Sequence, residues 1–183
     1  DVVSHLPGDD SDQARFLKAR YGDVVVVNTY IPQGMDINSD KFRYKLNWFQ
    51  WLREYLHKHH RPDERLIWCG DLNVAHRDID VYNPDSLWGH VCFCREVQEA
   101  LDSVMAWGLT DVFRQCCSEA EQYTFWDYRV PNGFKRNMGW RLDYIMATAP
   151  LARQCTSCRI DKEPRAWAKP SDHTFLIAEF NLE

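Results

Sequence analysis

The sequence lacks three features that would narrow its function at once: a positive net charge, a long hydrophobic run and an even number of cysteines. Its formal net charge is -5 and its sequence pI is about 5.8, so it is not a generally basic polyanion binder. Any nucleic-acid site must then be a local patch. No stretch of 18 apolar residues is present, so we expect no membrane span. At 183 residues the chain fits one domain with a sizeable core.

The cysteine pattern favours free thiols. Seven cysteines cannot all pair within one chain, which excludes a complete disulfide framework. Cys155 and Cys158 have metal-ligand spacing, but zinc would want a second such pair and the sequence has none. We therefore expect reduced thiols in a cytoplasmic protein, or a nuclear one if the host is a eukaryote. A zinc-binding cysteine module is the alternative.

Hydrophobic patterning predicts strands and helices mixed along the whole chain. A β-branched run over 23–31 and an apolar run over 66–69 predict buried strands, and apolar stripes predict helices over 41–60 and 95–107. Val2 and Val3 are expected to form the last part of a strand. Further short strands are expected at 122–127, 142–148, 157–162 and 174–181. This mixture predicts an α/β layered domain.

Polar residues gather where several of these strands end. The run Leu66–Cys69 stops at Gly70, and Asp71 and Asn73 follow with Leu72 between them. Three other segments carry polar groups in the same way, and these are Asn28-Thr29-Tyr30, Gly139–Tyr144 with Asp143, and Ser171-Asp172-His173. Strand ends and the loops after them are where rigid scaffolds place reactive groups. Each segment alone is more often a turn or a cap.

Together the four segments have a chemical logic. Asp71 and Asp172 could hold a hard cation through oxygen, as Mg²⁺ requires, and Asn73 adds a polar group without charge. His173 needs a carboxylate to fix its tautomer, and Asp143 is available. Tyr30 can donate to an anionic oxygen. This set suits attack of water on a phosphodiester, in which a metal and oriented donors stabilise the developing charge.

Five motifs carry a resemblance to a known family. They are "NTYIPQG", "CGDLNVAHRDIDVYNP", "YTFWDYR", "NMGWRLDYIMAT" and "KPSDH". In order and approximate spacing they resemble the exonuclease III-like apurinic/apyrimidinic endonucleases of the endonuclease/exonuclease/phosphatase superfamily. The resemblance runs from about residue 1 to the C-terminus. It implies a four-layered α/β sandwich, with two stacked mixed β-sheets flanked by helices, in a single domain over residues 1–183.

The resemblance also implies a role for each matching residue. Tyr30, Asp71, Asn73, Asp143 and His173 would form the catalytic set, in which Asp71 orients or deprotonates water and His173, paired with Asp143, sits against the scissile phosphate. Metal binding of Mg²⁺ or Mn²⁺ would fall to Asp71, Asn73, Asp172 and His173. An apolar pocket for a sugar without a base would be formed by Phe125, Trp140 and Leu142.

Contacts with double-stranded DNA are expected from strand ends and from one basic segment. Residues 129–141 hold four positive charges and no acid, with two aromatic residues between them. In a net acidic chain, next to an aromatic pocket, contact with the DNA backbone is the better interpretation. The expected DNA-binding residues are Asn28, Gln33, Arg129, Lys135, Arg136 and Arg141.

The implied function is that of a monomeric DNA-repair nuclease. It would hydrolyse the phosphodiester 5′ to abasic sites, with 3′-5′ exonuclease or 3′-phosphodiesterase activity possible. The family's metal-binding Glu lies in an N-terminal segment that this chain is expected to lack, so the chain corresponds to the C-terminal two-thirds and should be inactive or weak alone. The alternatives are a non-catalytic DNA-binding or interaction module, and a superfamily relative acting on RNA or other phosphoesters.

Overall fold

A six-stranded mixed sheet forms the centre of the computed structural model, which describes residues 1–11 and 13–182. Its strands are β1 (Val2–Val3), β2 (Phe16–Tyr21), β3 (Val24–Tyr30), β4 (Arg65–Asp71), β5 (Leu109–Asp111) and β6 (Asp143–Thr148). They lie in the order β1-β2-β3-β4-β6-β5. Only β3 and β4 are parallel, and the other neighbours are antiparallel. A second sheet pairs β7 (Cys155–Asp161) with β8 (Phe175–Phe180).

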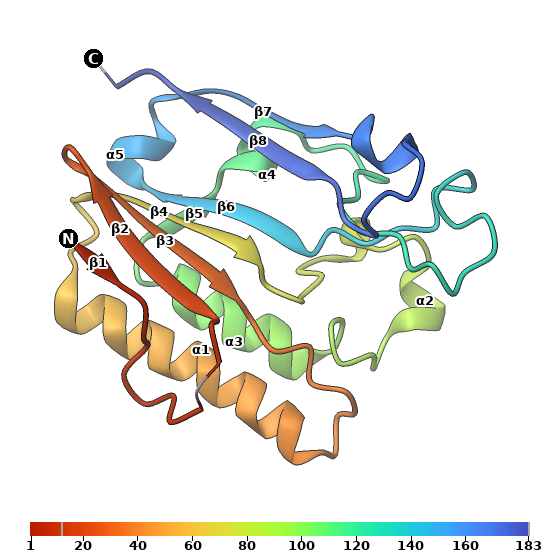
Figure 1. The fold of residues 1–183 in the computed structure, drawn as a ribbon, viewed down its shortest axis with the longest axis horizontal. Helices are drawn as coiled ribbons and strands as arrows, with labels where there is room; N and C mark the ends of the chain where they lie inside the picture. The colour runs from red at the N-terminus through yellow and green to blue at the C-terminus, as the bar shows by residue number, and fades with distance from the viewer. Residues whose placement is uncertain (12, 183) are drawn as a thin grey trace.

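Two long helices lie together on one face of the larger sheet, and the second sheet lies over the other face (Figure 1). They are α1 (Asp40–His59), which begins at the cap residue Ser39, and α3 (Arg95–Met105). Shorter helices are α2 (Pro84–Leu87), α4 (Val112–Cys116) and α5 (Ala149–Ala152), with 3₁₀ turns η1 (Asp78–Asp80) and η2 (Pro164–Ala166). The expected α/β sandwich of sheets and flanking helices is confirmed.

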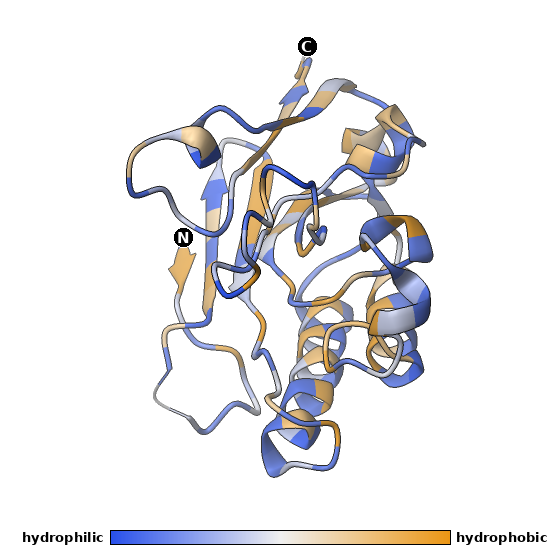
Figure 2. Ribbon diagram, turned by 90° about the vertical axis from the view of Figure 1, so that its right-hand side faces the viewer, coloured by the Kyte–Doolittle hydropathy of each residue, from blue (hydrophilic) through white to orange (hydrophobic). Residues whose placement is uncertain are grey.

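The core has two parts, one on each face of the larger sheet. The first packs α1 and α3 against the sheet and contains fully buried Trp48, Phe49 and Trp68. The second lies between the larger sheet and β7–β8, around Val112, Phe113 and Leu151. Figure 2 views the molecule from the end at which β3 and β4 finish, with α1 and α3 together below the loops. Burial on both faces explains the continuous apolar run of β3.

Arg141 is the centre of a buried ion network. Its side chain is 0% exposed, and its Nε and Nη2 donate to the two carboxylate oxygens of Asp80 at 2.8 and 3.2 Å. Nη1 forms an ion pair of 2.8 Å with Asp111, and Arg114 donates to Asp80 at 2.5 Å. The guanidinium also lies 4.2 Å from the ring centre of Tyr144. The prediction that Arg141 contacts DNA is wrong, because this side chain is enclosed in the core by its partners.

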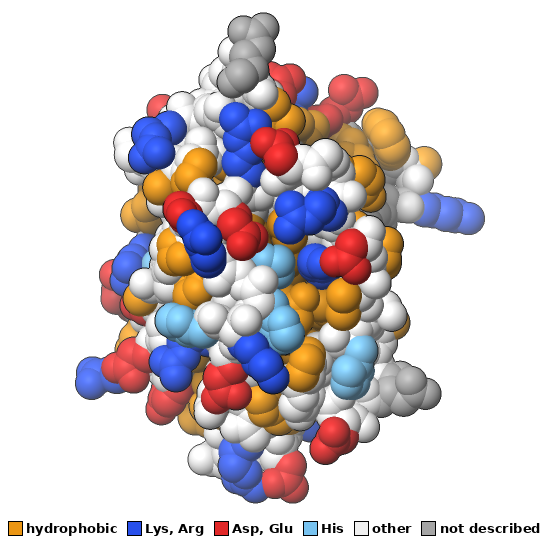
Figure 3. All heavy atoms as spheres, turned by 90° about the vertical axis from the view of Figure 1, so that its left-hand side faces the viewer, with side chains coloured by type: hydrophobic (Ala, Val, Ile, Leu, Met, Phe, Trp, Pro, Cys, Tyr) orange, Lys and Arg blue, Asp and Glu red, His pale blue; other side chains and the backbone are white. Residues whose placement is uncertain are grey.

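One predicted element is absent. No strand forms over 122–127, where the described chain makes only isolated bridges from Phe125 to Trp140 and to His173. No helix among the described residues is long and apolar enough to cross a membrane. All seven cysteines are free thiols. On the face at the left of Figure 1, acidic and basic side chains are interspersed (Figure 3).

Candidate active site

The registers of three neighbouring strands align three polar side chains. Tyr30 ends β3 and lies opposite Asp71, which ends β4. Asp71 in turn lies opposite Asp143, the first residue of β6. Gly70 makes the approach of β3 and β4 possible, because a Cβ at this position would meet the carbonyl oxygen of Thr29 at 2.0 Å, and its φ of +129° is a conformation suited to glycine.

The turn after β4 directs Asp71 and Asn73 to the same side. The Asn73 backbone N–H donates to Asp71 Oδ1 at 2.9 Å, and Asn73 Nδ2 donates to Asp71 Oδ2 and to the Ile31 carbonyl, both at 3.0 Å. Asn73 has a φ of +51°, which asparagine tolerates better than most residues. Leu72 between them is fully buried. The strand therefore stops so that one carboxylate and one carboxamide face the same cavity.

His173 completes this cluster from the loop before β8. Its Nδ1 lies 2.7 Å from Asp143 Oδ2, and its Nε2 lies 3.9 Å from Asp71 Oδ2. Burial alone would lower the pKa of His173, but the hydrogen bond and charge of Asp143, with the charges of Asp71 and Asp172, raise it above its usual value. The contact with Asp143 places the Nδ1 proton on that side, so Nε2 faces the cavity.

The surroundings of Asp71 disfavour its negative charge. Burial raises the pKa of Asp71 to about 7, and the nearby charge of Asp143 acts in the same direction. His173, the Asn73 N–H and Lys45 only partly offset this rise. A carboxyl with a pKa near neutral, next to a second carboxylate, has the charge balance of a site that a cation would complete.

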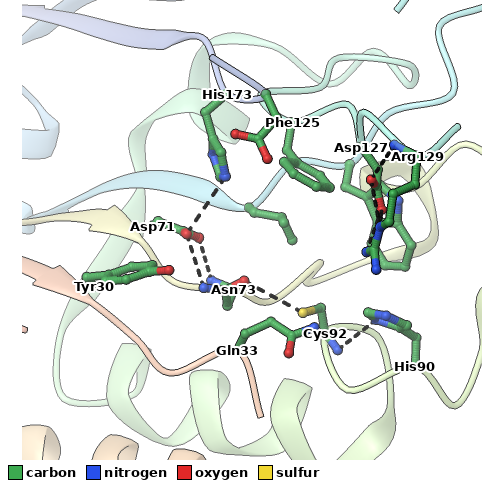
Figure 4. A pocket seen from close by; sticks show the side chains of 13 residues that line it. Tyr30, Gln33, Asp71, Asn73, His90, Cys92, Phe125, Asp127, Arg129 and His173 are labelled. Carbon is green, nitrogen blue, oxygen red and sulfur yellow. Dashed lines mark hydrogen bonds and ion pairs between the residues drawn. The ribbon is translucent and has the colours of Figure 1, made fainter. Parts of the chain in front are cut away.

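A cavity of about 350 Å³ contains most of the predicted site residues (Figure 4). Its polar side is formed by Tyr30, Asp71, Asn73, Asp172 and His173. Its apolar side is formed by Phe125, Trp140 and Leu142, as the sequence predicted, and Gln33 and Arg129 also line it. Asp143 lies behind His173 and outside this lining. The structure thus brings together ten of these residues around one opening.

Several lining residues have no counterpart in the sequence predictions. His90 packs its ring 4.9 Å from the ring of Trp140, and its Nδ1 accepts the Cys92 N–H at 3.1 Å. Cys92 and Asp127 also line the cavity. The loop that carries His90 and Cys92 has no periodicity, so no pattern in the sequence indicated either residue.

Lys45 connects three loops beneath the cavity. It is fully buried, and its Nζ donates to the carbonyls of Gln33, Asn73 and Val91 at 3.1, 2.7 and 2.7 Å. Burial lowers the pKa of Lys45 below its usual value. Its place between Phe42 and Phe49 on the apolar stripe of α1 is a signal that sequence reasoning missed, since a lysine on such a stripe needs buried partners.

The expected DNA-binding residues are dispersed around the opening. Lys135 and Arg136 are exposed on the loop before Trp140, and Arg129 is exposed but paired with Asp127 at 2.7 Å. Asn28 lines a neighbouring hollow together with Tyr30 and Asp71. Apart from buried Arg141, the predicted cations lie at the surface, with Arg129 at the cavity and Lys135 at a neighbouring groove.

Metal binding has a partial donor set among the described residues. Asp71, Asn73 and Asp172 offer oxygen atoms at the cavity, the ligand type that Mg²⁺ and Mn²⁺ prefer. No group of three or more His, Cys, Asp or Glu side chains is placed to hold an ion within residues 1–11 and 13–182. The unbalanced carboxylate charge at Asp71 fits a divalent cation, and the oxygen donors present fit the same ion.

The sequence of this chain matches one protein family and several individual relatives. The model of the endonuclease/exonuclease/phosphatase family matches residues 1–173. Exodeoxyribonuclease III of Haemophilus influenzae is 33% identical, over 96% of this chain and 70% of the relative. A DNA-(apurinic or apyrimidinic site) endonuclease of Dictyostelium discoideum is 32% identical, over 88% of this chain and 44% of the relative.

Solved structures with a similar fold include further enzymes of this kind. An AP endonuclease from Archaeoglobus fulgidus superposes with a TM-score of 0.96 and 42% identity, covering 100% of this chain and 71% of that chain. A 3′ phosphatase from Neisseria, bound to a product DNA hairpin, superposes with a TM-score of 0.93 and 34% identity, covering 99% and 70%. This chain thus spans between 44% and 71% of the length of these four proteins.

Proposed function

This chain belongs to the endonuclease/exonuclease/phosphatase family, and we propose that it hydrolyses the DNA phosphodiester 5′ to an abasic site. The family comprises metal-dependent endonucleases, exonucleases and phosphatases, and the two relatives described above are an exodeoxyribonuclease III and a DNA-(apurinic or apyrimidinic site) endonuclease. The observation that carries the proposal is the row of Tyr30, Asp71 and Asp143, completed by His173 at 3.9 Å from Asp71. Residues 1–183 would form part of one nuclease domain, active as a monomer.

Asp71 is the group that we propose to orient and deprotonate the attacking water. A general base must be ionised and within reach of the water, and although burial raises the pKa of Asp71 to about 7 in the metal-free chain, a bound cation would favour its ionised form. Asn73, fixed by its hydrogen bonds to Asp71 and Ile31, would hold the same water without adding charge. The water oxygen bonds to phosphorus as one water proton passes to Asp71, the P–O3′ bond breaks, and the leaving O3′ takes a proton from solvent water.

His173 would act on the phosphate. Asp143 holds Nδ1 at 2.7 Å, so Nε2 faces the cavity and, when protonated, would donate to a non-bridging oxygen, and Tyr30 would donate from the opposite side. Asp71, Asn73 and Asp172 would hold the metal through oxygen, the ligand type that Mg²⁺ prefers, which leaves His173 Nε2 to act on the phosphate. A bound Mg²⁺ or Mn²⁺ would supply Lewis-acid stabilisation of the phosphate there.

A single-turnover nicking assay tests the proposal. The chain is held in excess over a duplex with one tetrahydrofuran abasic analogue, so that weak activity is measurable. We expect cleavage with Mg²⁺, a severe loss in His173→Ala, and the parental rate in His57→Ala, a matched exposed histidine on α1. Undiminished nicking in excess EDTA would contradict a metal-dependent reaction.

A second candidate is removal of phosphate groups from DNA 3′ ends. The observation that favours it is the His90 ring, which lies 4.9 Å from Trp140 and occupies part of the apolar side where an abasic sugar would enter. One relative of known structure is a 3′ phosphatase. If His90 narrows the pocket, His90→Gly should raise nicking at abasic sites relative to release of 3′ phosphate. An unchanged ratio of the two rates would remove this candidate.

A further inference from the structure

A second groove lies beside the candidate active site, between the loops 127–135 and 164–170. We call it the Arg165 groove. It has a volume of about 400 Å³, and Tyr128, Lys135, Arg165 and Trp167 line it. The proposed hydrolysis makes no use of it.

Arg165 is a buried cation without an anionic partner. Its side chain is 9% exposed, and its guanidinium lies between the rings of Tyr128 and Phe134, at 5.2 and 5.3 Å from their centres. Nη2 donates to the Trp126 carbonyl at 3.2 Å, whereas the buried Nε has no hydrogen-bond partner. None of the ion pairs among the described residues includes it. A buried guanidinium in this condition favours a bound anion.

Exposed aromatic rings stand at the same groove. Trp167 is 60% exposed and Tyr128 is 58% exposed, and the Tyr128 hydroxyl donates to the Pro170 carbonyl, which joins the two loops. Lys135 adds a second positive charge at the wall, and the one acid there, Asp127, is already paired with Arg129. A phosphate site next to flat exposed rings is the pattern of a nucleotide-binding surface.

The groove adjoins the catalytic cavity. Asp127 lines both the catalytic cavity and the Arg165 groove. Trp167 and Pro170 line the groove and also a neighbouring hollow that reaches Asp143 and His173. A nucleic-acid strand leaving the catalytic cavity can therefore enter the groove along either wall.

We propose that the Arg165 groove binds one nucleotide of a single-stranded DNA segment that extends from the catalytic cavity. Its phosphate binds Arg165 and its base stacks on Trp167. The proposal rests on the proposed function, since it assigns the groove to the same DNA substrate. A base inside a duplex keeps its faces against its neighbours and is not free to stack on a protein ring, so the bound nucleotide is unpaired.

Binding of DNA hairpins by fluorescence anisotropy tests this assignment. Three hairpins share one duplex and carry a blunt end, a 3′ single-stranded tail or a 5′ tail, and EDTA prevents cleavage. We expect the chain to bind one of the tailed hairpins at least about fivefold more tightly than the blunt one, the lower end of base–aromatic stacking. In Trp167→Ala this ratio should fall by about that factor, leaving only the contribution of the phosphate contact with Arg165.

Two further variants serve as controls, one for loss of an exposed aromatic side chain and one for retention of charge at residue 165. Tyr21→Ala removes an aromatic side chain that is 71% exposed on β2 and should keep the parental ratio. Arg165→Lys retains the charge without the planar guanidinium and should lower the ratio, with urea unfolding to establish that it folds. Equal binding of all three hairpins by the parent, or a tail preference that is undiminished in Trp167→Ala, would overturn the proposal.

Competitor molecules distinguish binding of a DNA strand from binding of a free anion with the same phosphate chemistry. Inorganic phosphate and thymidine monophosphate, at matched ionic strength, should leave the tail preference intact. If either abolishes it at millimolar concentration, the groove binds a free anion or nucleotide and the strand assignment is wrong. Nicking of the abasic duplex by the parent chain reports the proposed function separately, so a failure there and a failure of tail binding are distinguishable.

Discussion

Asp71→Asn should stabilise the metal-free protein while removing its activity. The pKa of Asp71 is raised from 3.8 to about 7, chiefly by burial. Between these values the unfolded chain has lost the proton and the folded chain still holds it, so folding stability falls as pH rises through this window. Below about pH 4 both states are protonated and the penalty is absent.

The size of the effect follows from the two pKa values. Each pH unit in the window is worth ~1.4 kcal/mol, so the raised pKa of Asp71 lowers folding stability by on the order of 4 kcal/mol above pH 7 and by ~1.6 kcal/mol at pH 5, where the folded state still holds the proton. Asparagine has nearly the same shape and carries no charge. The difference in unfolding free energy between Asp71→Asn and the parent should therefore grow by roughly 2 to 3 kcal/mol between pH 5 and pH 8.

Urea unfolding in EDTA at pH 5, 6, 7 and 8 measures this difference directly. His173 and Asp143 are present in both proteins, so most of their own titration cancels. A saturating divalent cation favours the ionised carboxylate, so it should stabilise the parent and close the gap, by about 2.7 kcal/mol at a hundredfold excess over Kd. A difference that is independent of pH would refute the environment assigned to Asp71.

Three other substitutions test the surrounding structure. Lys45→Met should cost about 3 kcal/mol in urea unfolding, because buried carbonyls of three loops lose their donor, and an unchanged midpoint would contradict that role. Arg141→Met should cost ~3–5 kcal/mol, because it leaves buried carboxylates unpaired, whereas an effect below about 1 kcal/mol would place it outside the network. Lys135→Ala and Arg136→Ala should each lower the slope of log Kd against log salt by about 0.9, and parental slopes would place them outside the DNA interface.

Elements with strong local patterns were predictable from the sequence. The β-branched run of β3 and the apolar stripe of α1 gave boundaries within one residue or so of the structure. β2 was missed because its pattern is inverted: Lys18 is buried, where it contacts Asp1, while Leu17 is 45% exposed. An alternation with a cation on the inner face does not indicate a strand.

The polar side of the site was predictable because its residues lie in short, recognisable sequence motifs at the ends of strands. What the sequence could not give was the partner of each charge. Arg141 belongs to a segment rich in cations, and only the fold brings Asp80, a residue far away in sequence, to its guanidinium. The expected strand over 122–127 does not form for a similar reason. Phe125 makes single bridges to two different segments, at Trp140 and His173, and pairs continuously with neither.

The Asp143–His173 pair is the most direct test of the account. Asp143→Asn keeps the side-chain shape at 2.7 Å from Nδ1 but no longer favours the imidazolium with its proton on that nitrogen. In single-turnover nicking of an abasic duplex with Mg²⁺, the rate should fall on the order of 10³–10⁴, by analogy with the Asp of a hydrolytic triad. A parental rate in Asp143→Asn would contradict the central claim that this pair acts on the phosphate.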